Sequence, residues 1–418
     1  MKLGYNIRKI TKPGKEPAMK ILSITAQKPD STGSGVFLTE LVKGFRKLGC
    51  SQAVVCGIAA GENLTFPEEV MVFPVRYQTK ELPFPVCGMS DEMPYESTRY
   101  RDLDEKMTRQ FRHAFDTRIA EAVAVFQPDV ILCHHLYFVA ALVRQMYPEI
   151  PVYAQCHGSD LRQIETNSWA RSWILEQIPK LDGIFALHEI QEELICQIFD
   201  LPAHRIQVMG TGYNSNVFFE DQNLSRNPEK RRYLFAGKLS EKKGIYSLLR
   251  CLKHLKNPDE VEVYLAGGCG SEEELKKIRT AAENAPCPVT FLGKLNQGEL
   301  AAWMNRCDVF VLPSFYEGLP LVLIEAMACG MRTVCTDLPG IWPWLDYAIP
   351  EHGTIFVEPP RMEHTDEPDA SDLPEFELRL ADAMERAFLQ PLPDSRKVRS
   401  LSWEALCRKL LTIFNIGR

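Results

Sequence analysis

The stretch from Asp308 to Asp337 restricts the possible folds more than any other part of the sequence. It contains Val309–Leu312, a run as short and as apolar as a buried strand of a parallel sheet. A loop follows, and then a helix that we expect to begin near Leu319, because Pro320 suits a first helical turn. A second apolar strand is predicted at Arg332–Thr336. Strand, helix and strand in this order predict a parallel α/β unit.

Two carboxylates bracket this predicted helix: Glu317 in the loop and Glu325 two turns into an otherwise apolar segment. A buried carboxylate is costly unless something pairs with it. The helix N-terminus between them offers free N–H groups and a positive dipole end to an anion such as a diphosphate. Glu325 is therefore either paired with a neighbouring Arg or Lys in a structural core unit, or part of a ligand site. The carboxylate pair, with Pro and Gly around it, favours the ligand site.

At these residues the sequence resembles a known family. E-G-L-P-L-V-L-I-E-A-M-A-C-G is similar to the E-x7-E segment of the family-4 retaining glycosyltransferases (glycosyl transferases group 1), two-domain enzymes of the GT-B fold. The resemblance implies a nucleotide-sugar donor held mainly by the second domain. Glu325 would bond the ribose hydroxyls and Glu317 would lie by the donor sugar. The diphosphate would meet the backbone of Gly318, Leu319, Pro320 and Leu321.

Length and charge narrow the class of protein. A chain of 418 residues exceeds one ordinary core and predicts two domains of roughly 200 residues. The net charge of −7 and the pI of about 5.8 argue against nucleic acid as the main partner. The 13 cysteines form no C-x-x-C pair, so we expect neither a zinc site nor a redox motif. Unpatterned cysteines fit a reducing cytoplasm, and the sequence holds no apolar run of about 20 residues for a membrane helix.

Residues 1–18, MKLGYNIRKITKPGKEPA, form a separate basic segment. They carry five basic residues and one acidic residue and have no apolar centre, which a secretory signal needs. We expect a basic N-terminal extension, or a misassigned start, in a cytoplasmic protein. A basic segment can also be held by anionic lipid, so a peripheral contact at the inner membrane face is an alternative.

Three small residues, Gly33, Ser34 and Gly35, stand between a predicted strand at Lys20–Ala26 and a predicted helix at Val36–Leu48. Glycines in a loop at this place let a phosphate or a substrate approach the backbone closely. The pattern is not the six-residue dinucleotide fingerprint. The resemblance implies a loop in the interdomain cleft, near donor and acceptor.

The rest of the first half alternates strands with helices. Between Glu62 and Tyr100 the pattern is irregular, and the segment is either a family-variable insertion near the acceptor side or a surface loop. Strands are expected at Gln52–Ile58, Val70–Val75, Val130–His134, Val152–Cys156 and Gly183–Leu187.

A long helix is expected at Tyr100–Phe126. Its start contains Asp102 and Asp104, a D-x-D pair that can hold a metal from a loop after a strand. Acids at a helix start also complement the dipole, so we interpret this pair as structural and expect no metal site. The same helix carries a basic patch of Arg109, Arg112 and His113. This patch is either a solvated face or a contact with lipid headgroups.

The segment Gln155–Leu161, QCHGSDL, holds His157 at the carboxyl end of a strand, where parallel sheets bind ligands. The structural alternatives are a satisfied histidine in a turn and Asp160 as a helix N-cap. H-G-S-D is similar to the H-G-[ST]-D of the family, whose histidine reaches the donor sugar, and this favours sugar binding by His157. His134 and His135 end the preceding strand and are weaker candidates for acceptor contact.

The second half restarts with a strand at Tyr233–Ala236 and the loop GKLSEKKG. Lys238 and Lys243 are five residues apart on this strand-to-helix loop, where two cations can neutralise a departing diphosphate. The loop is similar to the family pattern G-R-L-x3-K-G. Lys243 matches its Lys, whereas Lys238 takes the place of Arg and keeps the charge without the bidentate fork. The resemblance implies catalytic roles for both.

Two further positions bear on the donor. By resemblance, the backbone around Gly293 and Lys294 recognises the base. After the central segment the family often has G-G-x-x-E, but this chain has P-G-I-W-P from Pro339 to Pro343. The Glu is absent and aromatic bulk follows, so a contact made there should be altered or lost.

The end of the chain predicts two helices, at Leu378–Phe388 and Ser402–Phe414, after an acidic loop at Pro359–Glu375. In the GT-B fold the last helix crosses back onto the first domain. We expect a basic extension at 1–18, an acceptor-side Rossmann-like domain at 19–212, a nucleotide-sugar-binding Rossmann-like domain at 213–395, and a returning helix at 396–418.

We therefore expect a metal-independent, cofactor-free retaining glycosyltransferase that moves a sugar from a nucleoside-diphosphate sugar to an acceptor hydroxyl. Cell-surface polysaccharide or glycoconjugate synthesis is the expected setting. Alternatives are a catalytically silent nucleotide-sugar-binding scaffold and another GT-B enzyme, such as an epimerase or a phosphorylase.

Overall fold

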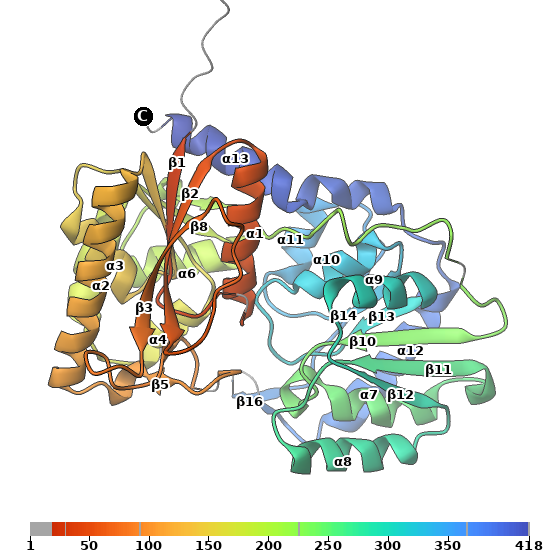
Figure 1. The fold of residues 1–418 in the computed structure, drawn as a ribbon. Coiled ribbons are helices and arrows are strands. Elements are labelled where there is room, and N and C mark those ends of the chain that lie inside the picture. The colour runs from red at the N-terminus through yellow and green to blue at the C-terminus, as the bar shows by residue number, and fades with distance from the viewer. Residues whose placement is uncertain (1–18, 30, 92, 225, 365–366, 417–418) are drawn as a thin grey trace, which may run out of the picture.

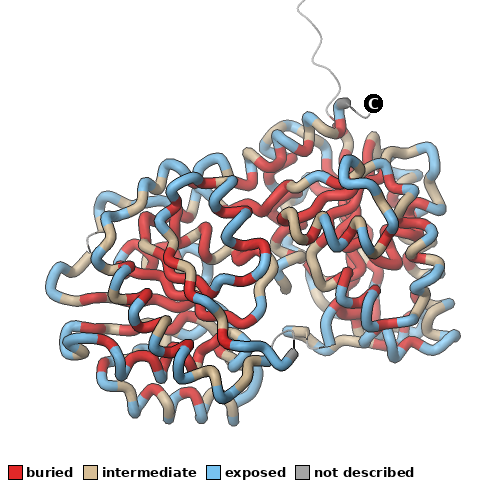
Figure 2. Tube along the Cα trace, turned by 180° about the vertical axis from the view of Figure 1, so that it is seen from behind, coloured by how far each residue is buried: buried red, intermediate tan, exposed pale blue. Residues whose placement is uncertain are grey.

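The computed structural model describes residues 19–29, 31–91, 93–224, 226–364 and 367–416, so the predicted extension at 1–18 lies outside them. Two lobes stand side by side, each built on a parallel sheet with helices on both faces (Figure 1). Buried residues fill the interior of each lobe, and exposed residues follow its outer helices and loops (Figure 2). The predicted architecture of two doubly wound α/β domains is confirmed.

The described residues of the first lobe form a seven-stranded parallel sheet in the order β3-β2-β1-β6-β7-β8-β9. Its strands are β1 (Lys20–Ile24), β2 (Ser51–Ala59), β3 (Met71–Tyr77), β6 (Val130–His134), β7 (Val152–Gln155), β8 (Gly183–Ala186) and β9 (Ile206–Val208). The helices of this lobe are α1 (Gly33–Lys47), α2 (Glu105–Phe126), α3 (Phe138–Met146), α4 (Ser159–Thr166), α5 (Arg171–Gln177) and α6 (Glu189–Phe199). A small separate pair is formed by β4 (Cys87–Gly88) and β5 (Thr98–Arg99).

The part of the second lobe that the structure describes repeats this plan with a six-stranded parallel sheet in the order β12-β11-β10-β13-β14-β15. Its strands are β10 (Arg231–Ala236), β11 (Val261–Ala266), β12 (Val289–Gly293), β13 (Val309–Leu312), β14 (Arg332–Thr336) and β15 (Ile355–Val357). The helices that follow are α7 (Ile245–Cys251), α8 (Glu272–Glu283), α9 (Gln297–Arg306), α10 (Leu321–Ala328), α11 (Ile341–Ala348), α12 (Leu373–Leu389) and α13 (Trp403–Ile416).

Strand order fixes where each sheet can bind a ligand. The first strand of each lobe lies inside its sheet, and the chain winds outward from it in both directions. The direction reverses between β1 and β6 in the first lobe and between β10 and β13 in the second. Loops at the carboxyl ends of such strand pairs diverge and leave a crevice, which is where open α/β sheets bind ligands.

The last helix returns to the first lobe and lies against α1, as predicted (Figure 1). The rings of Phe37 and Trp403 meet edge to face at 5.0 Å. A Cβ added to Gly44 would lie 2.5 Å from Cys407 Sγ, so glycine is what permits this close packing. Phe37, Trp403 and Cys407 belong to one buried cluster that also includes Leu323 of α10, and the two lobes therefore share a core.

Several predicted boundaries need correction. Helix α10 begins at Leu321, with Pro320 as its N-cap residue in extended backbone, two residues later than predicted. Residues 33–35 form the first turn of α1 and not a loop. The predicted acidic loop at Pro359–Glu375 contains the paired strands β16 (Met362–His364) and β17 (Glu367–Pro368) and the start of α12.

The irregular segment at 62–100 is not merely a surface loop. Leu82, Val86 and Cys87 are buried in the core of the first lobe. The predicted long helix begins later than expected, at Glu105, after a short 3-10 turn at Tyr100–Asp102.

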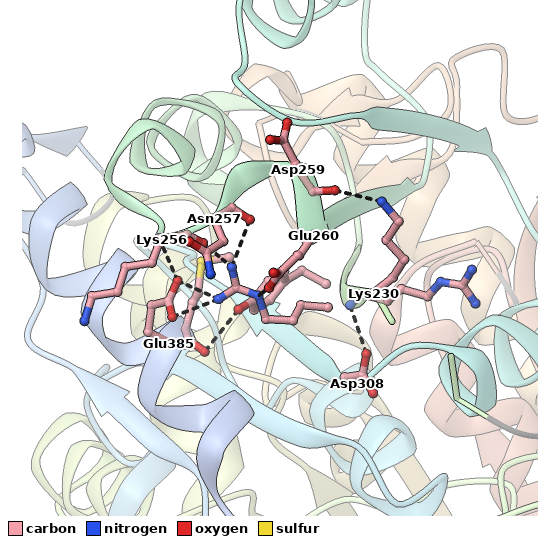
Figure 3. Close-up of polar contacts among 11 residues, drawn as sticks. Lys230, Lys256, Asn257, Asp259, Glu260, Asp308 and Glu385 are labelled. Atoms are coloured by element: carbon pink, nitrogen blue, oxygen red, sulfur yellow. Dashed lines mark hydrogen bonds and ion pairs between the residues drawn. The ribbon is translucent and has the colours of Figure 1, made fainter. Parts of the chain in front are cut away.

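A charged cluster closes the amino-terminal end of the second sheet, away from the strand ends that bind ligands. Arg231 donates to both carboxylate oxygens of Glu385 at 2.9 Å and to the carbonyls of Lys256 and Asn257. Glu385 also accepts from the backbone N–H of Lys256, and Lys230 Nζ donates to the carbonyl of Asp259 (Figure 3). All of these hydrogen bonds join residues of the second lobe, so we interpret the cluster as a structural anchor for β10 and not as a ligand site.

Within the described ranges, none of the helices combines the length and the apolar character needed to cross a bilayer.

Candidate functional site

Two loops meet at the reversal point of the second sheet. One follows β10 and the other follows β13, the strand beside it. The N–H of Phe315 donates to the carbonyl of Lys242 at 3.0 Å, which ties the loops together. Gly244 adopts a φ of +69°, and a Cβ there would lie 2.0 Å from the carbonyl oxygen of Pro313. Only glycine allows this approach, so the sequence dictates how closely the loops pack.

This packing brings two predicted site residues into contact. Lys243 Nζ lies 2.6 Å from Glu317 Oε1, although the two are 74 residues apart in sequence. The hydroxyl of Ser314 donates to the same carboxylate oxygen at 2.7 Å. The side chains of Glu317 and Lys243 are 14% and 30% exposed, so the pair is shielded yet reachable. Sequence analysis singled out both charges but missed Ser314, which stands three residues before Glu317 in the same loop.

Glu325 faces the first lobe from α10. Burial of its carboxyl group and, to a smaller extent, the carboxylate of Glu40 on α1 together raise its pKa to about 8. Part of the side chain remains accessible. The sequence-based alternative, an ion pair with a neighbouring Arg or Lys, is not what the described residues show. A neutral, protonated Glu325 can both donate to and accept from a hydroxyl group.

The remaining predicted donor residues lie at the carboxyl ends of β10 and β12, the two strands on either side of β11. Lys294 passes over Gly268, where an added Cβ would lie 2.5 Å from the lysine Cε. Gly293 has a φ of +71° and accepts a hydrogen bond from Gly267 N at 2.7 Å. Lys238 is exposed and lies near Gly270. Lys238, Gly293 and Lys294 thus share the sheet edge that carries Lys243 and Glu317.

In the first lobe, Gly33, Ser34 and Gly35 lie at the N-terminus of α1. Thr32 is the N-cap residue, and its hydroxyl accepts from Gly35 N at 3.1 Å. Ser34 Oγ donates to Gln27 Oε1 at 3.2 Å. The Nε2 of Gln27 is buried without a hydrogen-bond partner among the described atoms. This turn faces the reversal point between β1 and β6.

Three histidines gather at the ends of β6 and β7. His134 Nδ1 lies 3.2 Å from His157 Nε2, and the two rings are nearly parallel, with 12° between their planes. The ring of His135 lies 4.8 Å from that of His157. His135 also has a φ of +76°, which is rare for a residue other than glycine and marks local strain. The cluster thus brings His157, the predicted contact to the donor sugar, together with His134 and His135, the weaker candidates for acceptor contact.

The cluster is held uncharged at neutral pH. Burial and, to a smaller extent, the adjacent His135 together lower the pKa of His134 to about 3. Burial and both neighbouring imidazoles lower the pKa of His157 well below its usual range. Neutral imidazoles each offer one donor and one acceptor nitrogen.

Asp160 holds the backbone on which two of these histidines stand. Its carboxylate is fully buried and accepts from the backbone N–H of Leu136 at 2.7 Å and of His157 at 3.2 Å. The N-cap residue of α4 is Gly158, so the N-cap interpretation of Asp160 is wrong. Because Asp160 bonds the turns after β6 and β7, it fixes their separation. Its position three residues after His157 was visible in the sequence, but its bond to Leu136 was not.

The lobes touch around these loops. An added Cβ on Gly318 would lie 3.9 Å from Leu187 of the first lobe. Gly340, with a φ of +86°, would place a Cβ 2.4 Å from His188 Nδ1. This contact belongs to the segment that departs from the G-G-x-x-E pattern. It continues as α11, whose Trp344 is buried.

The other charged residues that the sequence singled out contact nearby residues of the first lobe. Asp104 caps α2 by accepting from Met107 N at 2.7 Å, and Asp102 pairs with Arg99, so both are structural, as interpreted. In the basic patch on α2, Arg109 pairs with Glu105 of the same helix. Arg112 lies 3.7 Å from Asp116, but it donates to Gln145 of α3 at 2.7 Å and lies over the ring of Trp173 on α5. Among residues with described positions, no group of three or more His, Cys, Asp or Glu side chains is arranged to hold a metal ion.

Among solved structures, several with the same fold as this chain are described as enzymes that act on sugars. A sucrose-phosphate synthase from Thermosynechococcus elongatus matches with a TM-score of 0.65 at 16% identity, covering 95% of this chain and 98% of that chain. Anabaena Alr3699/HepE in complex with UDP-glucose matches with a TM-score of 0.60 at 14% identity, covering 95% and 100%. At such identities the likeness shows the fold alone, which is GT-B.

Sequence comparison is more specific. The putative teichuronic acid biosynthesis glycosyltransferase TuaC of Bacillus subtilis (strain 168) is 26% identical over 347 residues, which cover 77% of this chain and 82% of that protein. The amylovoran biosynthesis glycosyltransferase AmsK of Erwinia amylovora is 28% identical over 239 residues, covering 52% and 55%. The model for Glycosyltransferase Family 4 matches residues 31–217, and the model for Glycosyl transferases group 1 matches residues 217–364. The chain therefore belongs to the group 1 glycosyltransferases of the GT-B fold, which transfer sugars.

Proposed function

We propose that this glycosyltransferase moves a sugar from a nucleoside-diphosphate sugar to an acceptor hydroxyl with retention of anomeric configuration and without a metal ion or other cofactor. The observation that carries the proposal is the contact between Lys243 and Glu317 at the reversal point of the second sheet. The contact puts a cation for the diphosphate and a carboxylate for the sugar on adjoining loops. The α10 N-terminus lies directly after them.

The donor is placed as follows. Its diphosphate lies against Lys238, Lys243 and the backbone from Gly318 to Leu321, where cations and helix N–H groups favour anions. Its ribose hydroxyls bond Glu325, whose pKa near 8 lets the carboxyl group donate as well as accept at neutral pH. Gly293 and Lys294 flank the base. The UDP-glucose complex of HepE, which shares the fold, supports this class of donor.

The reaction proceeds by departure of the diphosphate from the face that the acceptor attacks. The C1–O bond to the diphosphate breaks and its electron pair stays on the leaving oxygen. Lys238, Lys243 and the α10 N-terminus stabilise that charge. The acceptor oxygen then bonds C1 from the same face, and its proton passes to the departing diphosphate. Glu317 and His157 hold the sugar between the lobes.

The acceptor reaches the sugar from the first lobe, across the turn at Gly33, Ser34 and Gly35. Names of two relatives, in teichuronic acid and amylovoran biosynthesis, support a role in cell-surface polysaccharide synthesis. All 13 cysteines are free thiols, ten of them buried, which supports the cytoplasm as the compartment. A peripheral contact with the inner membrane face would bring the enzyme to a lipid-linked acceptor.

A thermal-shift screen against UDP, GDP, ADP and their common sugar conjugates tests the donor first. Binding to the folded state raises the melting temperature by mass action. We expect one nucleotide and its conjugates to give clear shifts, and no shift with any of them would contradict donor binding. Product NMR then reads the anomeric configuration. Turnover should be equal with EDTA and with added Mg²⁺, and a loss with EDTA would overturn metal independence.

A further inference from the structure

His134 and His157 share a hydrogen bond across two strand ends. Nδ1 of His134 lies 3.2 Å from Nε2 of His157, so one nitrogen carries the proton and the other offers its lone pair. The direction of this bond decides which proton His157 can present to a ligand. The surroundings of the other two ring nitrogens determine that direction.

The second nitrogen of His134 is enclosed. His134 is 3% exposed, and its Nε2 is buried without a hydrogen-bond partner among the described residues. A buried N–H without an acceptor loses its hydrogen bond to water and gains none in return, which is unfavourable. An unpaired acceptor is tolerated more readily than an unpaired donor. His134 therefore keeps its proton on Nδ1 and its lone pair on Nε2.

It follows that His134 donates and His157 accepts at Nε2. A neutral His157 then carries its own proton on Nδ1. Its side chain is only partly buried, so this N–H is the ring group available to a ligand. The carboxylate of Asp160 holds the two strand ends in place, because it accepts hydrogen bonds from the backbone N–H groups of both Leu136 and His157.

We propose that His134 is a positioning residue, which fixes His157 in the Nδ1–H tautomer and so gives the histidine a hydrogen-bond donor toward a sugar oxygen. This rests on the proposed function, in which His157 contacts the donor sugar. His134 itself touches no substrate. Because His157 meets the donor sugar and not the nucleotide, the effect should appear only with ligands that carry the transferable sugar in addition to the nucleotide.

Two substitutions separate hydrogen bonding from shape. In His134→Asn the amide nitrogen takes a place similar to that of Nδ1 and can still donate to His157. In His134→Phe the ring is kept but the donor is lost. His157→Gln assigns the His157 resonances and serves as the reference for a lost sugar contact, and His204→Asn, at an exposed site, is the matched control.

The first measurement needs no substrate. Nitrogen NMR of the protein labelled at histidine distinguishes a protonated ring nitrogen from an unprotonated one. We expect the Nδ1–H tautomer for His157 in the wild type and in His134→Asn, and a mixture of tautomers in His134→Phe. An Nε2–H tautomer for His157 in the wild type would overturn the inference.

The second measurement compares thermal shifts with UDP and with UDP-glucose. In His134→Phe, UDP should bind as in the wild type, whereas UDP-glucose should lose roughly tenfold in affinity, as for one hydrogen bond. His134→Asn should retain most of the sugar-dependent affinity. Equal behaviour of the Asn and Phe variants, or an unchanged UDP-glucose affinity in His134→Phe, would overturn it.

The two proposals fail in different ways. If His157→Gln lowers UDP-glucose affinity and His134→Phe does not, the positioning role is wrong and the proposed sugar contact stands. If neither UDP nor UDP-glucose shifts the wild type, the uridine donor is wrong and the tautomer measurement still decides the inference.

Discussion

Lys243 Nζ lies 2.6 Å from Glu317 Oε1, and this ion pair joins the loops that follow two adjacent strands of the second sheet. Ser314 holds the carboxylate from its other side. A diphosphate that approaches Lys243 therefore meets a cation already oriented by Glu317. The same contact keeps the carboxylate beside the position proposed for the donor sugar. Each side chain of the ion pair thus holds the other in the position proposed for its role.

Substituting Glu317 should separate catalysis from stability. We expect Glu317→Gln to lower kcat by roughly 10²–10³-fold, the usual range for one electrostatic group in an active site. The amide can still accept from Ser314 and Lys243, so the melting temperature should change little. Steady-state kinetics and a melting curve check both points. Glu241→Gln, exposed in the adjoining loop, removes the same charge and should leave turnover unchanged.

Removing the cation should act on the nucleotide. We expect Lys243→Met to weaken binding of UDP by roughly 10- to 100-fold, because a hydrogen bond to a charged group is lost. Calorimetric titration measures this directly, and raising the salt concentration should narrow the difference. Lys276→Met, at an exposed position on α8, is the matched change in net charge. Equal affinities for UDP in the two variants would remove Lys243 from the diphosphate site.

Glu325 should make stability depend on pH. Because its folded pKa of about 8 exceeds the usual 4.5, the folded state binds more protons than the unfolded state between these values. Stability from this group is thus complete below about pH 4.5 and falls as pH rises through 8. Glu325→Gln should raise the melting temperature relative to the wild type at pH 8 more than at pH 5. Melting curves of both proteins at several pH values check the sign.

The ribose contact needs a variant that lacks hydrogen-bonding groups, because Gln offers a donor and an acceptor as the protonated carboxyl group does. We expect Glu325→Leu to lower UDP affinity, whereas Glu325→Gln should keep most of it near neutral pH. Equal UDP affinities of Glu325→Leu and the wild type in a calorimetric titration would remove Glu325 from the ribose site.

The close approach of Gly244 to Pro313 should tolerate no side chain. In Gly244→Ala a Cβ would meet the Pro313 carbonyl at 2.0 Å, in backbone with a φ of +69°. We expect about 3 kcal/mol of destabilisation from strain and clash, with weaker UDP binding because the loops are displaced. Denaturant unfolding measures the loss. For comparison, Gly298→Ala on α9 meets nothing closer than 3.4 Å and should be neutral or slightly stabilising.

The elements that were predicted well have local signals. The β13 run is short, apolar and fully buried, and helix α10 follows between Pro and Gly residues. The predicted helix start was two residues early because proline lacks an N–H and suits the N-cap as well as the first turn. The segment at 62–100 has no periodicity, and Leu82 and Val86 become buried only through contacts with distant strands.

Within the site, residue types were visible but their partners were not. Lys243 and Glu317 stood out as charges in glycine-containing loops, yet their contact depends on β10 and β13 being neighbours. His134 stood out only as a strand-end histidine, because its bond to His157 requires β6 and β7 to pair in parallel. No local sequence pattern specifies the order of strands in a sheet. For this reason neither the contact between Lys243 and Glu317 nor the bond between His134 and His157 could be predicted.

The return of α13 to α1 has a consequence for how the chain is made. Cys407 Sγ contacts the carbonyl of Leu41, 366 residues earlier. Domains generally fold as units during synthesis, the N-terminal one first. The side of α1 that Trp403, Cys407 and Phe414 of α13 contact in the finished protein therefore has no cover until the whole second lobe has been made. During that interval α1 exposes an apolar face, and this is the stage of biosynthesis at which a chaperone would bind.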